Sequence, residues 1–222
     1  MTLLDFPGSV ACTIFLSGCN FRCPFCHNFE LVEGPIGTPI EEKEFFDFLN
    51  KRKNLLDGIA ITGGEPTLKP DLYDFMDKIK KQGFKVKLDT NGYNPTAIRK
   101  IINEKLADYI AMDVKNSPNK YALTTGLKNI DLNKIDESIS ILKTSDIPYE
   151  FRTTIIEELH DEKSISELSQ WIAGCQQYFL QPFEKKETVP NQNLHAPTKK
   201  EMITLKNIAS LYIPKVEIRA MN

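Results

Sequence analysis

The sequence has no apolar run as long as the roughly 20 residues that a membrane-spanning helix requires, so we do not expect a membrane protein. The chain also does not open on a basic segment followed by an apolar stretch, so we expect no secretory signal and predict a cytoplasmic location. Basic residues are not in excess, because 28 Lys and Arg stand against 30 Asp and Glu. A protein that binds nucleic acid tightly is therefore not indicated.

Cysteines are few, with five in 222 residues, and three of them fall within eight residues. In a chain without secretory features this spacing favours metal binding or redox chemistry over a disulfide framework. The two remote cysteines are Cys12, inside an expected strand, and Cys175, just past an expected helix, and we expect both to be buried packing residues. The length suits a single domain over residues 1–222.

Strand-like and helix-like segments alternate along the whole chain. The alternation predicts parallel strands joined by helices, either as a doubly wound sheet or as an incomplete barrel. Two polar stretches, 116–129 and 184–197, fit neither type of segment and are expected to be active-site loops. The expected strands are 10–16, 58–62, 84–88, 107–112, 149–156, 177–183 and a short 215–218; the expected helices are 70–82, 95–103, 131–143 and 163–173, with two more that begin at capping boxes at 38–41 and 198–201.

Polar signatures directly follow the first four expected strands, which favours the barrel. In a parallel barrel these positions share the carboxyl-terminal rim, where active sites are built. We therefore predict an α/β fold, a partial TIM-like (β/α)6 barrel. The signatures are a cysteine loop, a Gly-Gly-Glu-Pro turn at 63–66, Asp-Thr-Asn-Gly at 89–92 and Asp-Val-Lys at 113–115.

The cysteine loop carries three thiols, Cys19, Cys23 and Cys26, with three and then two residues between them. Three thiolates on a four-iron cluster leave one iron open for a substrate-like molecule. The alternative is a structural zinc site, which requires four nitrogen or sulfur ligands. His160 and His195 are distant in sequence, and we expect both to be structural or solvated; His160 is expected at a surface connection.

This cysteine spacing and the glycine-rich turn resemble the signatures of the radical S-adenosylmethionine (radical SAM) superfamily. The motifs at 26–28, 89–92 and 113–115 are similar to those of activating enzymes of glycyl-radical enzymes. The opening Leu-Leu-Asp-Phe-Pro-Gly and the segment 180–183 resemble activators of anaerobic ribonucleoside-triphosphate reductase. The resemblance implies a [4Fe–4S] cluster that cleaves S-adenosylmethionine to a 5′-deoxyadenosyl radical.

The resemblance also implies roles for the rim residues. Gly63 and Gly64 would offer main-chain groups to the methionine amino group, and Glu65 would contribute charge or hold the turn. Lys115 and Arg152 would pair with the cofactor carboxylate, and Phe25 and Asn28 would lie against its adenine or ribose. The implied ligands of a monovalent cation are Asp89, Thr90 and Asp113.

Under the resemblance, the expected partners are a glycyl-radical enzyme of the anaerobic ribonucleotide reductase type and a flavodoxin- or ferredoxin-like reductant. Two alternatives stay open. One is a radical SAM enzyme that acts on a small molecule or peptide, and the other is a non-catalytic iron–sulfur protein. The second alternative leaves the glycine turn and the 113–115 motif without a purpose.

Overall fold

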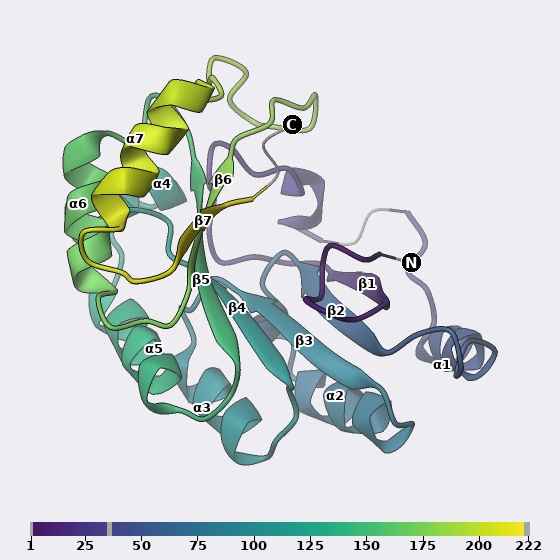
Figure 1. The fold of residues 1–222 in the computed structure, drawn as a ribbon. Coiled ribbons are helices and arrows are strands. Elements are labelled where there is room, and N and C mark those ends of the chain that lie inside the picture. Colours follow the sequence, from purple (N-terminus) through teal and green to yellow (C-terminus); the bar gives the residue numbers. More distant parts are fainter. Residues whose placement is uncertain (1, 35–36, 220–222) are drawn as a thin grey trace.

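Seven parallel strands form one curved sheet in the chain order β1 to β7 (Figure 1). The computed structural model describes residues 2–34 and 37–219. Within these ranges no pairing joins β7 to β1, so the barrel is open, which confirms the predicted partial barrel. The seventh strand is the short one expected at 215–218. The strands are β1 (Ala11–Leu16), β2 (Gly58–Gly63), β3 (Lys85–Thr90), β4 (Tyr109–Asp113), β5 (Tyr149–Ile155), β6 (Tyr178–Pro182) and β7 (Val216–Ile218).

Helices cover the outer, convex face of the sheet (Figure 1). Side chains alternate between the two faces of a strand, and those of Leu88, Met112 and Phe151 are fully buried under the helices. Their neighbours Asp89 and Arg152 face the concave side, where a cavity lies. The helices are α1 (Glu42–Asn50), α2 (Leu72–Lys81), α3 (Pro95–Asn103), a short α4 (Tyr121–Thr125), α5 (Leu132–Thr144), α6 (Glu162–Trp171) and α7 (Lys199–Ala209).

The two expected capping boxes have different outcomes. The box at Thr198 is confirmed, because the Thr198 hydroxyl accepts a hydrogen bond from the Glu201 amide. The Glu201 carboxylate accepts one from the Thr198 amide in turn. The box at Thr38 is wrong, because α1 begins at Glu42. Ile40 in the intervening segment is 73% exposed. A helical turn there would bury nothing, and packing provides most of the stability of a short helix.

The N-terminal segment folds back against the amino-terminal end of the barrel. Thr2 forms an antiparallel bridge to Ala11, and Phe6 is buried with its ring 6.3 Å from that of Tyr109. Phe6 also lies against Gly58, where an added Cβ would come within 2.8 Å of the ring. These contacts close the end of the barrel opposite the predicted site.

The two stretches without an expected element differ in structure. Residues 116–129 contain the 3₁₀ turn Pro118–Lys120 and α4, whereas residues 184–197 contain no regular element. A five-residue helix lies below the length that a periodic pattern can reveal. No helix within the described residues is both long and apolar enough to cross a membrane.

Candidate active site

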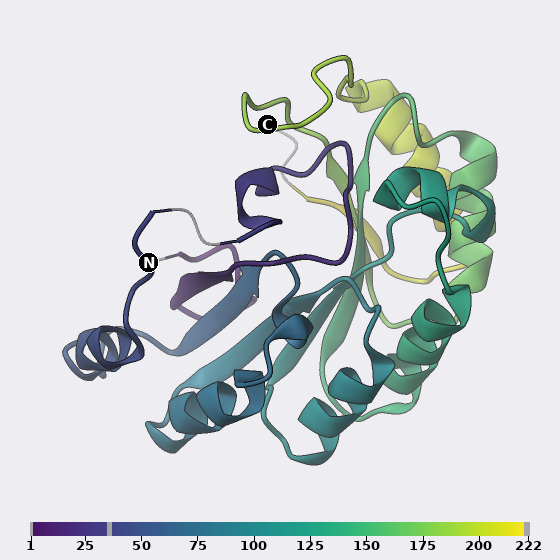
Figure 2. The same ribbon diagram turned by 180° about the vertical axis from the view of Figure 1, so that it is seen from behind.

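A cavity of about 860 Å³, including its open mouth, lies at the carboxyl-terminal ends of β1 to β5. The cysteine loop crosses the concave side of the sheet (Figure 2), and its three cysteines line the cavity. Of the predicted site residues, Glu65 lies outside the lining, and those that line it are Cys19, Cys23, Phe25, Cys26, Asn28, Gly63, Gly64, Asp89, Thr90, Asp113, Lys115 and Arg152.

Six further residues line this cavity and were not predicted from the sequence. Thr154 could have been found, because it lies two positions after Arg152 on the same face of β5. Thr62 likewise precedes the glycine turn, and Asn91 belongs to a motif that the sequence had singled out. The six residues are Phe21, His27, Val32, Thr62, Asn91 and Thr154.

Backbone hydrogen bonds hold the start of the cysteine loop against the glycine-rich turn. The carbonyl of Gly18 accepts from the Glu65 amide at 2.8 Å, and the Gly18 amide donates to Leu31 at 2.6 Å. The Cys19 amide donates to Val32 at 3.0 Å. The first thiol is therefore placed by main-chain contacts that do not depend on sulfur chemistry.

The two stretches expected as active-site loops support the cysteine loop and do not line the cavity. From residues 116–129, the Thr125 carbonyl accepts from the Arg22 amide at 2.8 Å. From residues 184–197, the Asn191 amide donates to Pro24 at 3.0 Å, and the Glu184 carbonyl contacts His27 Nε2 at 2.5 Å. Both loops thus fix the path of the chain between the cysteines.

The three thiols suit a cluster better than a single ion. A zinc ion bonds sulfur at about 2.3 Å and would draw its ligands to within about 4 Å of one another. Within the described part of the chain, the ligand atoms gathered inside 4.8 Å belong to the exposed Glu157, Glu158 and His195, and not to the three cysteines. The three thiols are thus not all within 4.8 Å of one another, which is compatible with a group larger than a single ion.

Burial raises the pKa of all three thiols, that of Cys23 to about 12. These side chains are therefore protonated at neutral pH while no metal is bound. Coordination requires thiolates, so loading iron must release protons. The donor set and the cavity together are compatible with the predicted [4Fe–4S] cluster.

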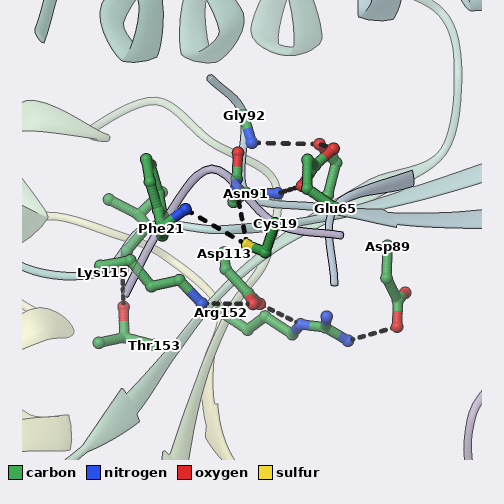
Figure 3. Close-up of polar contacts among 12 residues, drawn as sticks. Cys19, Phe21, Glu65, Asp89, Asn91, Gly92, Asp113, Lys115, Arg152 and Thr153 are labelled. Carbon is green, nitrogen blue, oxygen red and sulfur yellow. Dashed lines mark hydrogen bonds and ion pairs between the residues drawn. The ribbon is translucent and has the colours of Figure 1, made fainter. Parts of the chain in front are cut away.

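Glu65 connects the glycine-rich turn to the Asp-Thr-Asn-Gly motif (Figure 3). Its carboxylate is 1% exposed and accepts from the Thr67 amide, the Thr90 hydroxyl at 2.8 Å and the Asn91 amide at 2.6 Å. Burial nevertheless raises its pKa. Asn91 in turn donates to Asn20 in the cysteine loop at 2.8 Å. Glu65 therefore holds the turn, one of its two predicted roles, and acts on the cavity through Asn91.

A line of charged side chains crosses the cavity from β3 to β5 (Figure 3). Arg152 lies between two carboxylates, with Nε 2.5 Å from Asp113 and Nη1 3.3 Å from Asp89. Lys115 contacts Asp113 at 2.8 Å, and Lys87 contacts Asp89 at 2.5 Å. Among the charged side chains that line the cavity, Arg152 and Lys115 balance Asp89 and Asp113. The buried Lys87 adds one more positive charge beside Asp89, and these cations favour an anionic ligand.

Ion pairing determines the charge of these groups. Burial opposes ionisation of Asp113, but Arg152 and Lys115 beside it hold its pKa well below the usual range. Burial also opposes the charge on Lys115, and Asp113 more than compensates and raises its pKa. All three groups are therefore charged at neutral pH.

The predicted cation ligands are brought close together but are occupied by other contacts. Arg152 bridges Asp89 and Asp113, and the Thr90 hydroxyl donates to Glu65. A monovalent cation at this position would compete with the guanidinium. Binding of a cation here stays a prediction.

His160 is structural, one of the two roles expected for it, but its expected location at a surface connection is wrong. It is 5% exposed and not at a surface connection, with Nδ1 accepting from the Ile156 amide at 3.1 Å and Nε2 2.9 Å from the Lys115 carbonyl. His195, in contrast, is exposed and contacts Glu158. Cys12 and Cys175 are buried, as expected.

Stability should fall in mild acid because of His160. Burial lowers its pKa to about 4, so between this value and the ordinary value of about 6.5 the unfolded chain binds the proton and the folded chain does not. The contribution of His160 to the free energy of unfolding is fully present above about pH 6.5 and is lost as the pH falls toward about 4. The free energy of unfolding should decrease by about 2 kcal/mol between pH 7 and pH 5. Urea unfolding of the metal-free chain should show this loss, and His160→Gln should lack it. Equal pH dependence in both proteins would contradict the assignment.

Comparisons with known proteins agree with the resemblance that the cysteine and glycine motifs indicate. The model of the radical SAM superfamily matches residues 13–167. A protein of Methanocaldococcus jannaschii, named as a candidate glycyl-radical enzyme activating enzyme, is 36% identical over 230 residues, covering 100% of this chain and 94% of its own. The pyruvate formate-lyase-activating enzyme of Clostridium pasteurianum is 27% identical over 201 residues, covering 87% of this chain and 80% of its own.

Solved structures show a similar fold. Streptococcus suis SuiB bound to S-adenosylmethionine aligns with a TM-score of 0.74 at 13% identity, covering 98% of this chain and 52% of that chain. A domain of the pyruvate-formate lyase-activating enzyme from Bacteroides vulgatus aligns with a TM-score of 0.61 at 21% identity, covering 73% and 99% of the two chains. At these identities the likeness concerns the fold alone.

Proposed function

The chain belongs to the radical SAM superfamily, and from this we propose that it installs a glycyl radical in a partner enzyme of the anaerobic ribonucleoside-triphosphate reductase type. As a member of this superfamily it is an enzyme whose cofactors are a [4Fe–4S] cluster and S-adenosylmethionine. The observation that carries the activating role is the similarity, over the whole of this chain, to a protein named as a candidate glycyl-radical enzyme activating enzyme. The reductase type of the partner rests on the resemblance of the opening segment and of residues 180–183.

Different cavity residues would hold the two cofactors. Cys19, Cys23 and Cys26 would supply three thiolates for three irons, which would leave one iron free. When bound, the two cofactors supply a one-electron cleavage that yields methionine and a 5′-deoxyadenosyl radical. The protein has to orient the bound molecule and exclude water.

We assign the carboxylate of S-adenosylmethionine to the charged line that runs from β3 to β5. Lys115 and Arg152 are the two cations of this line that line the cavity, so they are the groups that would bind the carboxylate. Gly63 and Gly64 would present backbone groups to the amino end. Phe25 and Asn28 also line the cavity, and Asn28 contacts the Gly63 carbonyl at 3.5 Å, so they are the side chains that would contact the nucleoside part.

Edge strands β1 and β7 are not joined within the described residues. We propose that a peptide loop carrying the target glycine approaches the cavity from this open side of the barrel. The reducing electron has to come from outside this chain, and a flavodoxin- or ferredoxin-like protein is the donor that we propose.

The test is a reconstitution under anaerobic conditions. The iron-loaded protein, reduced with dithionite and mixed with S-adenosylmethionine and anaerobic ribonucleotide reductase, should yield 5′-deoxyadenosine together with the electron paramagnetic resonance signal of a glycyl radical. Product without a radical on the reductase, but with one on another glycyl-radical enzyme, would change the partner. Product without a radical on any such enzyme would favour a small-molecule or peptide substrate.

A further inference from the structure

The chain beyond the end of β4 is held by side chains where backbone pairing has stopped. The last paired residues are Asp113 and Arg152, and the Val114 amide still donates to the Arg152 carbonyl at 3.0 Å. The Thr153 hydroxyl then donates to the Val114 carbonyl at 2.6 Å. His160 continues the series at Lys115, the next residue along.

The hydrogen bonds of His160 fix its tautomer. The Ile156 amide can only donate, so Nδ1 is the acceptor at 3.1 Å. Nε2 therefore carries the proton and donates to the Lys115 carbonyl at 2.9 Å. Because the ring is buried and both nitrogens are engaged, it sets the separation between the loops that follow β4 and β5.

A second buried side chain joins the same two loops. Asn116 is fully buried, and its Nδ2 donates to the Leu159 carbonyl at 3.0 Å and to the Thr124 hydroxyl at 2.9 Å. The backbone is therefore held on both sides of the Lys115 carbonyl, by the Thr153 hydroxyl at Val114 and by the side chain of Asn116. The side chain of Lys115 itself has one fixed partner among the described residues, Asp113.

From this geometry we propose that His160 is a positioning residue, which sets the place of the Lys115 ammonium and thereby the recognition of a ligand carboxylate. The inference rests on the proposed function, in which Lys115 pairs with the carboxylate of S-adenosylmethionine. A lysine held by its backbone loses less conformational freedom on binding than a freely moving one. Releasing the loop should therefore weaken carboxylate recognition while the rest of the cavity stays intact.

Two substitutions separate the two hydrogen bonds. The amide of glutamine can replace Nε2, so His160→Gln keeps a donor for Lys115. The shorter asparagine can replace Nδ1 alone, so His160→Asn keeps the bond to Ile156 and loses the one to Lys115. Asn116→Ala removes the neighbouring tether, and Lys115→Met removes the charge itself.

The experiment compares two ligands on the iron-loaded protein by equilibrium dialysis: S-adenosylmethionine, and its decarboxylated form, which lacks only the carboxylate. We expect the native protein to prefer S-adenosylmethionine, and Lys115→Met to lose that preference. His160→Asn should reduce it about 10-fold, the scale on which loss of an outer-shell partner acts, and His160→Gln should retain it. Binding of the decarboxylated ligand should not change in any variant.

The outcomes separate this inference from the proposed function. If the native protein binds both ligands equally, the carboxylate placement in the proposed function fails. If Lys115→Met loses the preference while His160→Asn keeps it, or if His160→Asn weakens both ligands alike, His160 does not act through Lys115. Should His160→Asn not fold, Asn116→Ala is expected to lose the preference in the same way, and an unchanged preference there overturns the proposal.

Discussion

Cys23→Ala should abolish the formation of 5′-deoxyadenosine from S-adenosylmethionine. Cys23 is the most deeply buried of the three cavity thiols. Within the described residues no fourth cysteine lines this cavity, so none can replace it. Loss of a mere outer-shell partner costs a metal site about 10- to 100-fold, so loss of a ligand should cost more than about 100-fold. Iron content and product, measured after anaerobic reconstitution, should fall together.

Cys175→Ala is the matched control. Cys175 is 2% exposed, so its truncation leaves a similar cavity, but it lies outside the cavity lining. This variant should retain iron and product at the native level. Native levels of both in Cys23→Ala would show that the third iron ligand is a different residue.

Sequence patterns predicted the strands and the cavity well because both depend on local order along the chain. Polar motifs directly after buried strands must meet at one rim of a parallel barrel, whichever helices separate them. Asp89, Asp113 and Arg152 were brought together for this reason. The same reasoning could have placed Thr154 and Asn91 in the lining of the cavity.

What sequence could not predict depends on contacts between distant segments. His160 contacts a carbonyl 45 positions earlier, and no local pattern distinguishes it from a histidine in a surface connection. Phe21 and Val32 line the cavity because of the path of the cysteine loop, which the loops at 116–129 and 184–197 determine. At Thr38 a local pattern was present but misleading, because a complete capping signature does not begin a helix there and α1 starts at Glu42.

Gly64→Ala should weaken binding of S-adenosylmethionine by about 100-fold, the scale expected when a site is displaced by about 1 Å. An added Cβ would lie 2.0 Å from the Gly18 carbonyl oxygen and 2.6 Å from its carbon, and both atoms are backbone. The same carbonyl accepts from the Glu65 amide at 2.8 Å. The methyl group must therefore push the cysteine loop away from the glycine turn, because no flexible side chain is present to move instead.

The close approach, and not backbone strain, makes this glycine necessary. Gly63 has a φ of +123°, which disfavours any side chain, but the backbone of Gly64 is not in that region. Gly34→Ala is the control, because Gly34 is also unstrained and an added Cβ there meets nothing within 4 Å. Equilibrium dialysis on the iron-loaded proteins should show native affinity for Gly34→Ala and weak binding for Gly64→Ala. If Gly64→Ala also binds with native affinity, the contact between the turn and the cysteine loop does not shape the site.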